Sequence, residues 1–215
     1  MCFDLFSSLK PVMIQKKALT PELAPKAEQI LDGAMREFLK RGYAATSMDR
    51  VAATAGVSKA TVYSHFGDKE GLFEALVKQL AERKFAQVYR GQPLEGEPKT
   101  VLRQVACTLL KTVAKDLDYQ EFVRLIIGES GRFPHLAQTF VRNLFKPGLA
   151  TLTQYLAEQP SLKCRDPEAT ARVFLGGLIH FVIVQRLMHG SEILPIEEDR
   201  IIDCSIECLF GTDCR

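Results

Sequence analysis

Apolar residues recur at every third or fourth position along most of the chain, and the alternation typical of strands is nearly absent. This spacing places the apolar side chains on one face of a helix. In the first such segment Ala27, Ile30 and Phe38 share a face, and Gly42 is expected to end the helix. The pattern therefore predicts an all-α fold.

Two short helices are expected after Gly42. Thr46 or Ser47 can cap the first, whose apolar residues at i, i+3, i+4 and i+7 are Met48, Val51, Ala52 and Ala55. Gly56 then interrupts the pattern, and Ser58 can cap the second helix. The inward side of that second helix would consist of Val57, Val62 and Phe66.

A longer helix follows, with Asp68 as its cap and an end near Tyr89. Beyond it lies the densest group of helix breakers in the chain, Gly91, Pro93, Gly96 and Pro98. We place a domain boundary there. Asp166 before Pro167 is typical of a helix start, and the further helices are expected at residues 99–116, 118–130, 135–158, 167–189 and 197–210.

The two short helices, joined through Gly56, have the layout of a helix-turn-helix, whose second helix lies in the DNA major groove. On spacing alone an ordinary helical hairpin is an equal alternative. The outward side of the second helix favours DNA, because it offers donors for phosphates and base edges, namely Lys59, Thr61, Tyr63, Ser64 and His65. Ala60 or Thr61 could offer a methyl group to thymine, and Lys69, in the next helix's first turn, could help hold a phosphate.

The segment from Gly42 to Phe73 resembles the DNA-binding domain of the TetR/AcrR family of regulators. The resemblance rests on the runs Ala55-Gly56-Val57-Ser58, Thr61-x-Tyr63-x-His65-Phe66 and Lys69-Glu70-x-Leu72. It implies a subunit of nine helices, a homodimer formed by the last two long helices, and repression that ends when a small-molecule inducer enters the C-terminal domain. Residues 122–136 also resemble a segment of some AcrR-like regulators.

The resemblance also implies roles for individual residues on a double-stranded DNA operator. The residues that would face bases are Lys59, Ala60, Tyr63 and Ser64. Those that would hold the DNA backbone are Thr46 or Ser47, Thr61, Tyr63, His65 and Lys69. No local sequence pattern identifies the inducer, the operator sequence or the regulated genes.

The expected organisation has four parts. Residues 1–19 form an N-terminal extension, either a flexible arm whose lysines add phosphate contacts or a tail without a role. Residues 20–67 form the three-helix DNA-binding domain, residues 68–90 a connecting helix, and residues 91–215 a ligand-binding and dimerisation domain. Residues 1–90 hold fourteen Lys and Arg against ten Asp and Glu, whereas the remainder holds fourteen against sixteen. This asymmetry fits nucleic acid at the N-terminal end.

The composition, 47% hydrophobic and 25% charged, allows a core that needs no disulfides or metals to fold. We expect a cytoplasmic protein without a membrane partner, because there is no secretory signal and no uninterrupted apolar run of spanning length. The six cysteines are expected to be reduced structural thiols: Cys2, Cys107, Cys164, Cys204, Cys208 and Cys214. Cys204 and Cys208, four residues apart, leave a redox signal open as an alternative.

The segment 167–189 is apolar on nearly every side, so a second subunit is expected to cover part of it. The apolar face expected to pair consists of Phe174, Leu178, Phe181 and Val182. Gly176 and Gly177 indicate either the close approach of a backbone or ligand, or plain close packing. An apolar small molecule is expected to enter between the long helix at 68–89 and the helices at 99–116, 118–130 and 167–189. The long helix would transmit the resulting tilt to the DNA-binding motif.

A sensor cavity would be mostly apolar with a few polar groups. The candidate lining residues are Phe122, Arg124, Ile126, Phe140, Phe145, Phe174, His180, Phe181 and Gln185, although aromatic residues at helical spacing are often simply core. An enzyme is the competing class. No HExxH, GxSxG or Walker pattern is present, so we assign no catalytic residue, cofactor or metal site.

Overall fold

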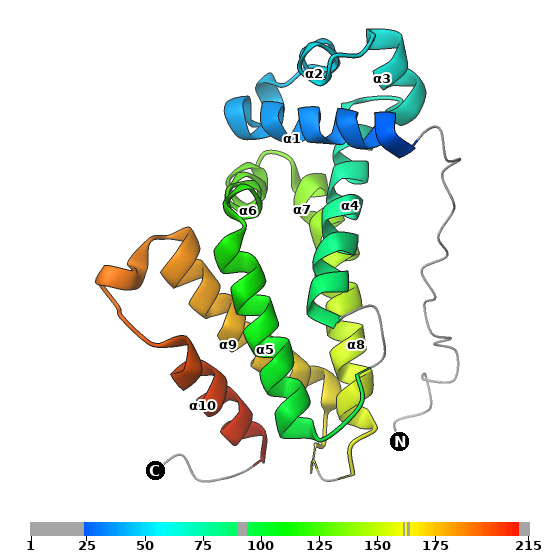
Figure 1. Ribbon diagram of the computed structural model, residues 1–215. Coiled ribbons are helices and arrows are strands. Elements are labelled where there is room, and N and C mark those ends of the chain that lie inside the picture. Colours follow the sequence, from blue (N-terminus) through cyan, green and yellow to red (C-terminus); the bar gives the residue numbers. More distant parts are fainter. Residues whose placement is uncertain (1–23, 90–93, 161, 163, 211–215) are drawn as a thin grey trace.

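The computed structural model describes residues 24–89, 94–160, 162 and 164–210 (Figure 1). Every regular element in these ranges is helical, which confirms the all-α prediction. The expectations for residues 1–19 and for the breakers Gly91 and Pro93 lie outside the described residues.

The first three helices are α1 (Ala24–Ala45), α2 (Met48–Ala55) and α3 (Lys59–Phe66). Ser47 caps α2 by accepting from the Arg50 amide, and Ser58 caps α3 by accepting from the Thr61 amide. Gly56 ends α2 in the left-handed region with φ of 67°, where an L side chain would be strained. The predicted turn chemistry is therefore confirmed at each of these three positions.

Helix α4 (Lys69–Tyr89) runs from the three N-terminal helices into the C-terminal part of the molecule, as predicted (Figure 1). Asp68 caps it through a hydrogen bond to the Gly71 amide. The C-terminal helices are α5 (Pro98–Lys115), α6 (Leu117–Glu129), α7 (Pro134–Phe140), α8 (Lys146–Ala157), α9 (Pro167–Val182) and α10 (Glu198–Phe210).

The predicted helix at 135–158 exists, but a π-helical turn, η1 (Val141–Phe145), joins α7 to α8. Pro147 has no amide hydrogen and cannot donate to the carbonyl four residues earlier, which explains a widened turn at this point. With α7, η1 and α8 taken as one rod, the described residues form the nine helices that the resemblance implies. A second π turn, η2 (Ile183–Leu187), extends α9, and a short 3-10 helix, η3 (Gly190–Glu192), follows it.

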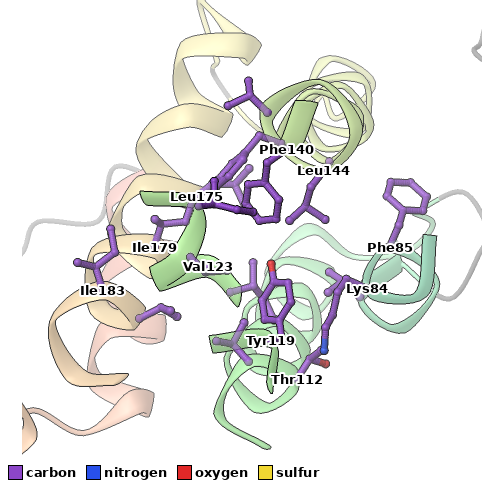
Figure 2. Close-up of a pocket in the computed structure, with 18 of the residues that line it drawn as sticks. Lys84, Phe85, Thr112, Tyr119, Val123, Phe140, Leu144, Leu175, Ile179 and Ile183 are labelled. Atoms are coloured by element: carbon purple, nitrogen blue, oxygen red, sulfur yellow. The ribbon is translucent and has the colours of Figure 1, made fainter. Parts of the chain in front are cut away.

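The described residues form two hydrophobic cores, and their division does not follow the breaker cluster. The N-terminal core joins α1 to α4 with side chains from α6 and α7, among them Phe122, Ile126, Leu136 and Phe140. The C-terminal core is built from the end of α4 with α5, α8, α9 and α10. Helices α1 to α3 therefore share a core with α6 and α7. An apolar cavity lies between α4, α5, α6, α8 and α9 (Figure 2).

Helix α9 corrects the expected dimer face. Phe174, Leu178 and Phe181 are buried in the core of their own subunit, because α8 and α10 pack on that side of α9. The outward side carries Val173, which is 72% exposed, and Gly176. The stretch Pro167–Leu187 is long and apolar enough to cross a membrane by length and composition, a test that core helices of soluble proteins also pass.

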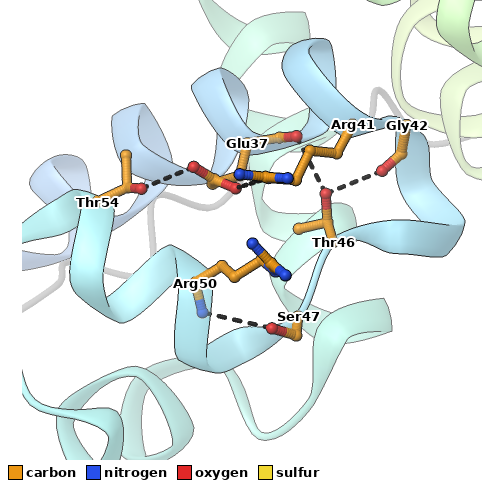
Figure 3. Close-up of polar contacts among 7 residues, drawn as sticks. All are labelled: Glu37, Arg41, Gly42, Thr46, Ser47, Arg50 and Thr54. Carbon is orange, nitrogen blue, oxygen red and sulfur yellow. Dashed lines mark hydrogen bonds and ion pairs between the residues drawn. The ribbon is translucent and has the colours of Figure 1, made fainter.

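Buried polar contacts fasten α1 to α2 (Figure 3). The Glu37 carboxylate accepts from the Thr54 hydroxyl at 2.7 Å and from Arg41 Nε at 3.0 Å. The Thr46 hydroxyl donates to the carbonyl oxygens of Glu37 and Gly42 at 3.0 and 2.8 Å. The Thr54 hydrogen bond, together with Arg41, lowers the pKa of Glu37 despite its burial.

We expect Glu37→Gln to lower the free energy of unfolding by about 1.5 to 3 kcal/mol at pH 7, the range for hydrogen bonds to a charged group. The pKa of Glu37 is depressed in the folded state, so its contribution is present above the unfolded value of about 4.3 and is lost as the pH falls through the folded value. Urea denaturation from pH 7 to pH 3 should show the gap between variant and wild type closing. Glu28→Gln, which breaks the exposed pair with Arg83, is the control and should change little.

The α1–α2 crossing gives a second prediction. A Cβ atom on Gly33 would lie 2.9 Å from Ala55 Cβ and 3.1 Å from the Ala55 amide nitrogen. Gly33→Ala should therefore cost about 1 to 3 kcal/mol of stability through overpacking, measured as a lower midpoint of thermal unfolding. Gly128→Ala, where a Cβ meets nothing within 4 Å, should not lower the midpoint. Equal midpoints for the two variants would show that the helices can separate at no cost.

Candidate DNA interface and ligand cavity

Helix α3 presents one polar face outward. Lys59, Ala60, Tyr63 and Ser64 are exposed, and Thr61 and His65 are half-buried. The opposite side holds α3 in place, because Val62 is fully buried among the residues of the N-terminal core. The residues predicted to face bases therefore lie together on one accessible surface.

The most exposed cation of this surface, Lys59, is paired within the protein. Its ammonium lies 2.7 Å from Asp49 Oδ1 of α2 and 5.7 Å from the centroid of the Tyr63 ring. The hydrogen bond with Asp49 raises the pKa of Lys59, which keeps the ammonium charged. A phosphate would have to compete with Asp49 for this group.

The two alternatives for a contact with the DNA backbone, Thr46 and Ser47, have different environments. Thr46 is buried and its hydroxyl is committed to the two α1 carbonyl groups described above. Ser47 is exposed at the start of α2. Ser47 is therefore the member of the pair that DNA could reach without rearrangement.

Lys69 is the predicted site residue whose surroundings differ most from expectation. Its ammonium donates to the carbonyl oxygens of Tyr43, Thr46 and Ala44 at 2.9, 3.1 and 3.3 Å, and it lies 4.5 Å from the centroid of the Tyr43 ring. These carbonyls lie at the C-terminal end of α1 and in the turn that follows it. In this structure Lys69 anchors α4 to α1, so the predicted phosphate contact must compete with three internal acceptors.

The cavity of the C-terminal part has a volume of about 340 Å³, within the range of roughly 300 to 1,000 Å³ typical of small-molecule sites. Its wall is mostly apolar and receives side chains from α4, α5, α6, α7, η1, α8 and α9. Ile127, Val141 and Phe145 belong to this wall and are also exposed, so they lie where the cavity meets the surface.

Three of the nine predicted ligand residues line this cavity: Ile126, Phe140 and Phe145. The other six do not line it. Three aromatic side chains are buried in the two cores, namely Phe122, Phe174 and Phe181, and His180 is exposed on α9. Arg124 and Gln185 line a separate polar depression, where they donate to the carbonyl oxygens of Leu187 and Leu194 at 2.9 and 2.7 Å.

The sequence placed the ligand against the long helix at 68–89, but none of the nine candidate ligand residues came from that helix. Lys84, Phe85, Val88 and Tyr89 all line the cavity. One signal was available: Lys84 continues the apolar series of Val77, Leu80 and Ala81 at helical spacing. A lysine inside an apolar stripe indicates a buried charge that needs a partner.

The Lys84 side chain, 8% exposed, has that partner in Asp116. The two groups are 2.6 Å apart, and the ammonium lies 4.6 Å from the centroid of the Tyr119 ring. Asp116 also caps α6 by accepting from the Tyr119 amide at 2.9 Å. Burial opposes ionisation of Asp116, but the Lys84 and Tyr119 hydrogen bonds outweigh it and lower the pKa of this carboxyl.

The cysteines show no bridge among the described residues. Cys107 and Cys164 are half-buried, and Cys204 and Cys208 are exposed on α10. Within the described ranges, no group of three or more His, Cys, Asp or Glu side chains is arranged to hold a metal ion.

Comparison with known proteins connects both regions to one family. Residues 30–76 match the model described as bacterial regulatory proteins, tetR family, and residues 100–211 match that described as AefR-like transcriptional repressor, C-terminal domain. The HTH-type transcriptional regulator YvkB of Bacillus subtilis (strain 168) is 25% identical over 189 residues, which are 85% of this chain and 94% of YvkB. AcrR of Shigella flexneri is 32% identical over 92 residues, 41% of this chain and 42% of AcrR.

Solved structures agree with these matches. A TetR-family regulator from Mesorhizobium loti MAFF303099 superposes with a TM-score of 0.73 at 29% identity, covering 90% of this chain and 98% of its own. The flavonoid-responsive regulator FrrA superposes with a TM-score of 0.72 at 30% identity, covering 86% of this chain and 95% of its own. Together with the capped helix-turn-helix and its exposed polar face, these matches show that the chain belongs to the TetR/AcrR family of DNA-binding transcriptional regulators.

Proposed function

We propose that this protein is a repressor that binds a near-palindromic operator as a homodimer and leaves it when a small molecule occupies the cavity. The observation that carries the proposal is the exposed face of α3, which is fixed by the Ser58 cap, the left-handed Gly56 and the buried Val62. A rigid polar helix face of this kind suits insertion into the major groove.

On the operator, the base-facing residues are Lys59, Ala60, Tyr63 and Ser64, and the backbone contacts come from Ser47, Thr61 and His65. The exposure of the first four supports this division. Each subunit carries one recognition helix, so two-fold symmetry requires two half-sites separated by one helical turn of about 34 to 36 Å or a multiple of it.

The homodimer forms through the outward sides of α9 and α10. Helix α9 exposes Val173 and Gly176 although the helix is strongly apolar, and a partner subunit would cover this surface. The adjoining face of α10 exposes Cys204 and Cys208. In such a dimer both thiols would lie near the two-fold axis, and we propose no signalling role for them.

The ligand is a mostly apolar molecule of modest size, as the volume and wall of the cavity require. FrrA, similar to this chain over nearly its whole length, is named for its response to flavonoids, which supports an aromatic ligand here. Regulation, rather than catalysis, is the activity that this site supports, and the protein works in the cytoplasm where its operator lies.

Ligand and operator are coupled through α4 and α6. Helix α4 carries Lys69 at the DNA end and Lys84 at the cavity, and α6 lines the cavity while packing against α1. To lower the occupancy of the operator from nearly complete to nearly zero, the ligand must bind the released conformation about 5.5 kcal/mol more favourably than the DNA-bound conformation. Linkage then requires that operator DNA weaken the ligand's affinity by the same factor.

For DNA binding, we expect Tyr63→Ala and Lys59→Ala each to weaken operator binding by about 1 to 3 kcal/mol and to relax the preference for the base pair that the residue contacts. The operator is first located by footprinting the upstream region of the protein's own gene, and affinities are then measured for the operator and for its single-base-pair variants. Lys146→Ala, an exposed lysine on α8, is the charge-matched control and should leave both the affinity and the base preference unchanged. A footprint without dyad symmetry would count against the proposal.

For assembly, Gly176→Arg should abolish the dimer while the subunit stays folded. A Cβ atom at Gly176 would meet nothing within 4 Å in its own subunit, and Gly176 is exposed, so the substitution tests the partner contact. Gly128→Arg is the control, because its surroundings are equally open. Sedimentation and circular dichroism measure the two effects, and a dimeric Gly176→Arg variant would exclude this face.

A further inference from the structure

We propose that the cavity selects a neutral aromatic molecule that carries a hydrogen-bond acceptor, such as an aromatic ketone, and that Lys84 and Tyr119 bind this acceptor. The inference rests on the proposed function, because it assigns the chemistry of the ligand that occupies the same cavity. It narrows the expected apolar ligand to one with a polar atom at a defined place.

The first observation is the cost of placing Lys84 in this wall. A buried ion pair is often no more stabilising than apolar residues of similar size, because both charges lose their hydration. An apolar side chain at position 84 would complete both the stripe on α4 and the cavity wall. The presence of a lysine is therefore not explained by the stability of the fold alone.

The second observation is a surplus of donors at this part of the wall. The Lys84 ammonium has three N–H donors, and among the described residues its hydrogen-bond acceptor is Asp116. The Tyr119 hydroxyl has no hydrogen-bond partner among those residues, and Figure 2 shows it pointing into the cavity. Burial raises the pKa of Tyr119, so its hydroxyl keeps the proton and acts as a donor.

The third observation is that the charge is already balanced. Asp116 neutralises Lys84 at 2.6 Å, so a carboxylate ligand would add an uncompensated negative charge next to Asp116 in an apolar cavity. A carbonyl oxygen accepts from the available donors without that cost. The aromatic part of the ligand would lie against Phe85, Phe140 and the other apolar groups of the wall.

The same contacts connect ligand binding to the packing of α4 against α6. Asp116 caps α6 while holding Lys84 of α4, so an acceptor that binds the ammonium changes the link between these two helices. Both helices extend from the cavity to the DNA-binding domain.

Three probes of matched shape test the inference: biphenyl, 4-acetylbiphenyl and biphenyl-4-carboxylate. Binding to the full chain is measured by calorimetry, and release is measured on operator DNA. Wild type should bind 4-acetylbiphenyl about 10- to 100-fold more tightly than biphenyl, as expected for a hydrogen bond from a charged donor, and more tightly than the carboxylate.

Two variants separate recognition from a structural role. The double substitution Lys84→Met with Asp116→Asn removes both charges together, and asparagine keeps the N-cap of α6. Tyr119→Phe removes only the hydroxyl and serves if the double variant does not fold. Each should reduce the ratio of ketone to biphenyl affinity, which a merely structural role would not change.

The outcomes are distinct. Equal binding of ketone and biphenyl, tighter binding of the carboxylate, or an unchanged ratio in the variants would overturn this inference and leave the proposed function intact. If no probe binds while operator binding is normal, the cavity as ligand site fails, and with it both the release mechanism and this inference.

Discussion

The arrangement of this molecule depends on an aromatic cluster that joins the DNA-binding helices to the sensor helices. Phe73 of α4 packs edge-on against Phe38 and Tyr43 of α1, with ring centroids 5.7 and 5.5 Å apart. It also stacks on Phe122 of α6, with a centroid separation of 5.6 Å. Aromatic pairs in these geometries stabilise a structure beyond the area they bury. Because the rings come from three helices, none of these helices can tilt without moving the others' contacts.

This constraint changes the description of the chain as two domains joined by one connecting helix. Tyr43 also packs against Phe133, in the turn between α6 and α7, at 5.1 Å, and Lys69 ties α4 to the carbonyl end of α1. A displacement of α6 at the cavity therefore reaches α1 directly as well as through α4. Close-packed interfaces of this kind favour a few discrete packings over continuous deformation, which suits a switch.

The DNA-binding motif could be predicted from the sequence because its determinants are local. Ser47, Gly56 and Ser58 act within one turn of their own helices, so their residue types specify the structure without tertiary context. Lys69 shows where local reasoning fails. Its position in a first helical turn suggested a phosphate, whereas its acceptors come from a segment more than twenty residues earlier in the chain.

The cavity was the least predictable part for the same reason. Phe140 and Phe174 are both buried aromatic residues on apolar helices, yet only the first lines the cavity, because the packing of neighbouring helices decides which side faces the open volume. The π turn at Val141–Phe145 makes the prediction harder still. A widened turn changes the direction in which the side chains of α8 point relative to those of α7. Charge gave the better clue, because a buried lysine requires a counter-charge and local hydrogen bonding wherever the helices place it. In an apolar wall, the sequence pattern alone does not show which residues face the cavity, and a charged residue that interrupts the pattern is the position that sequence can single out.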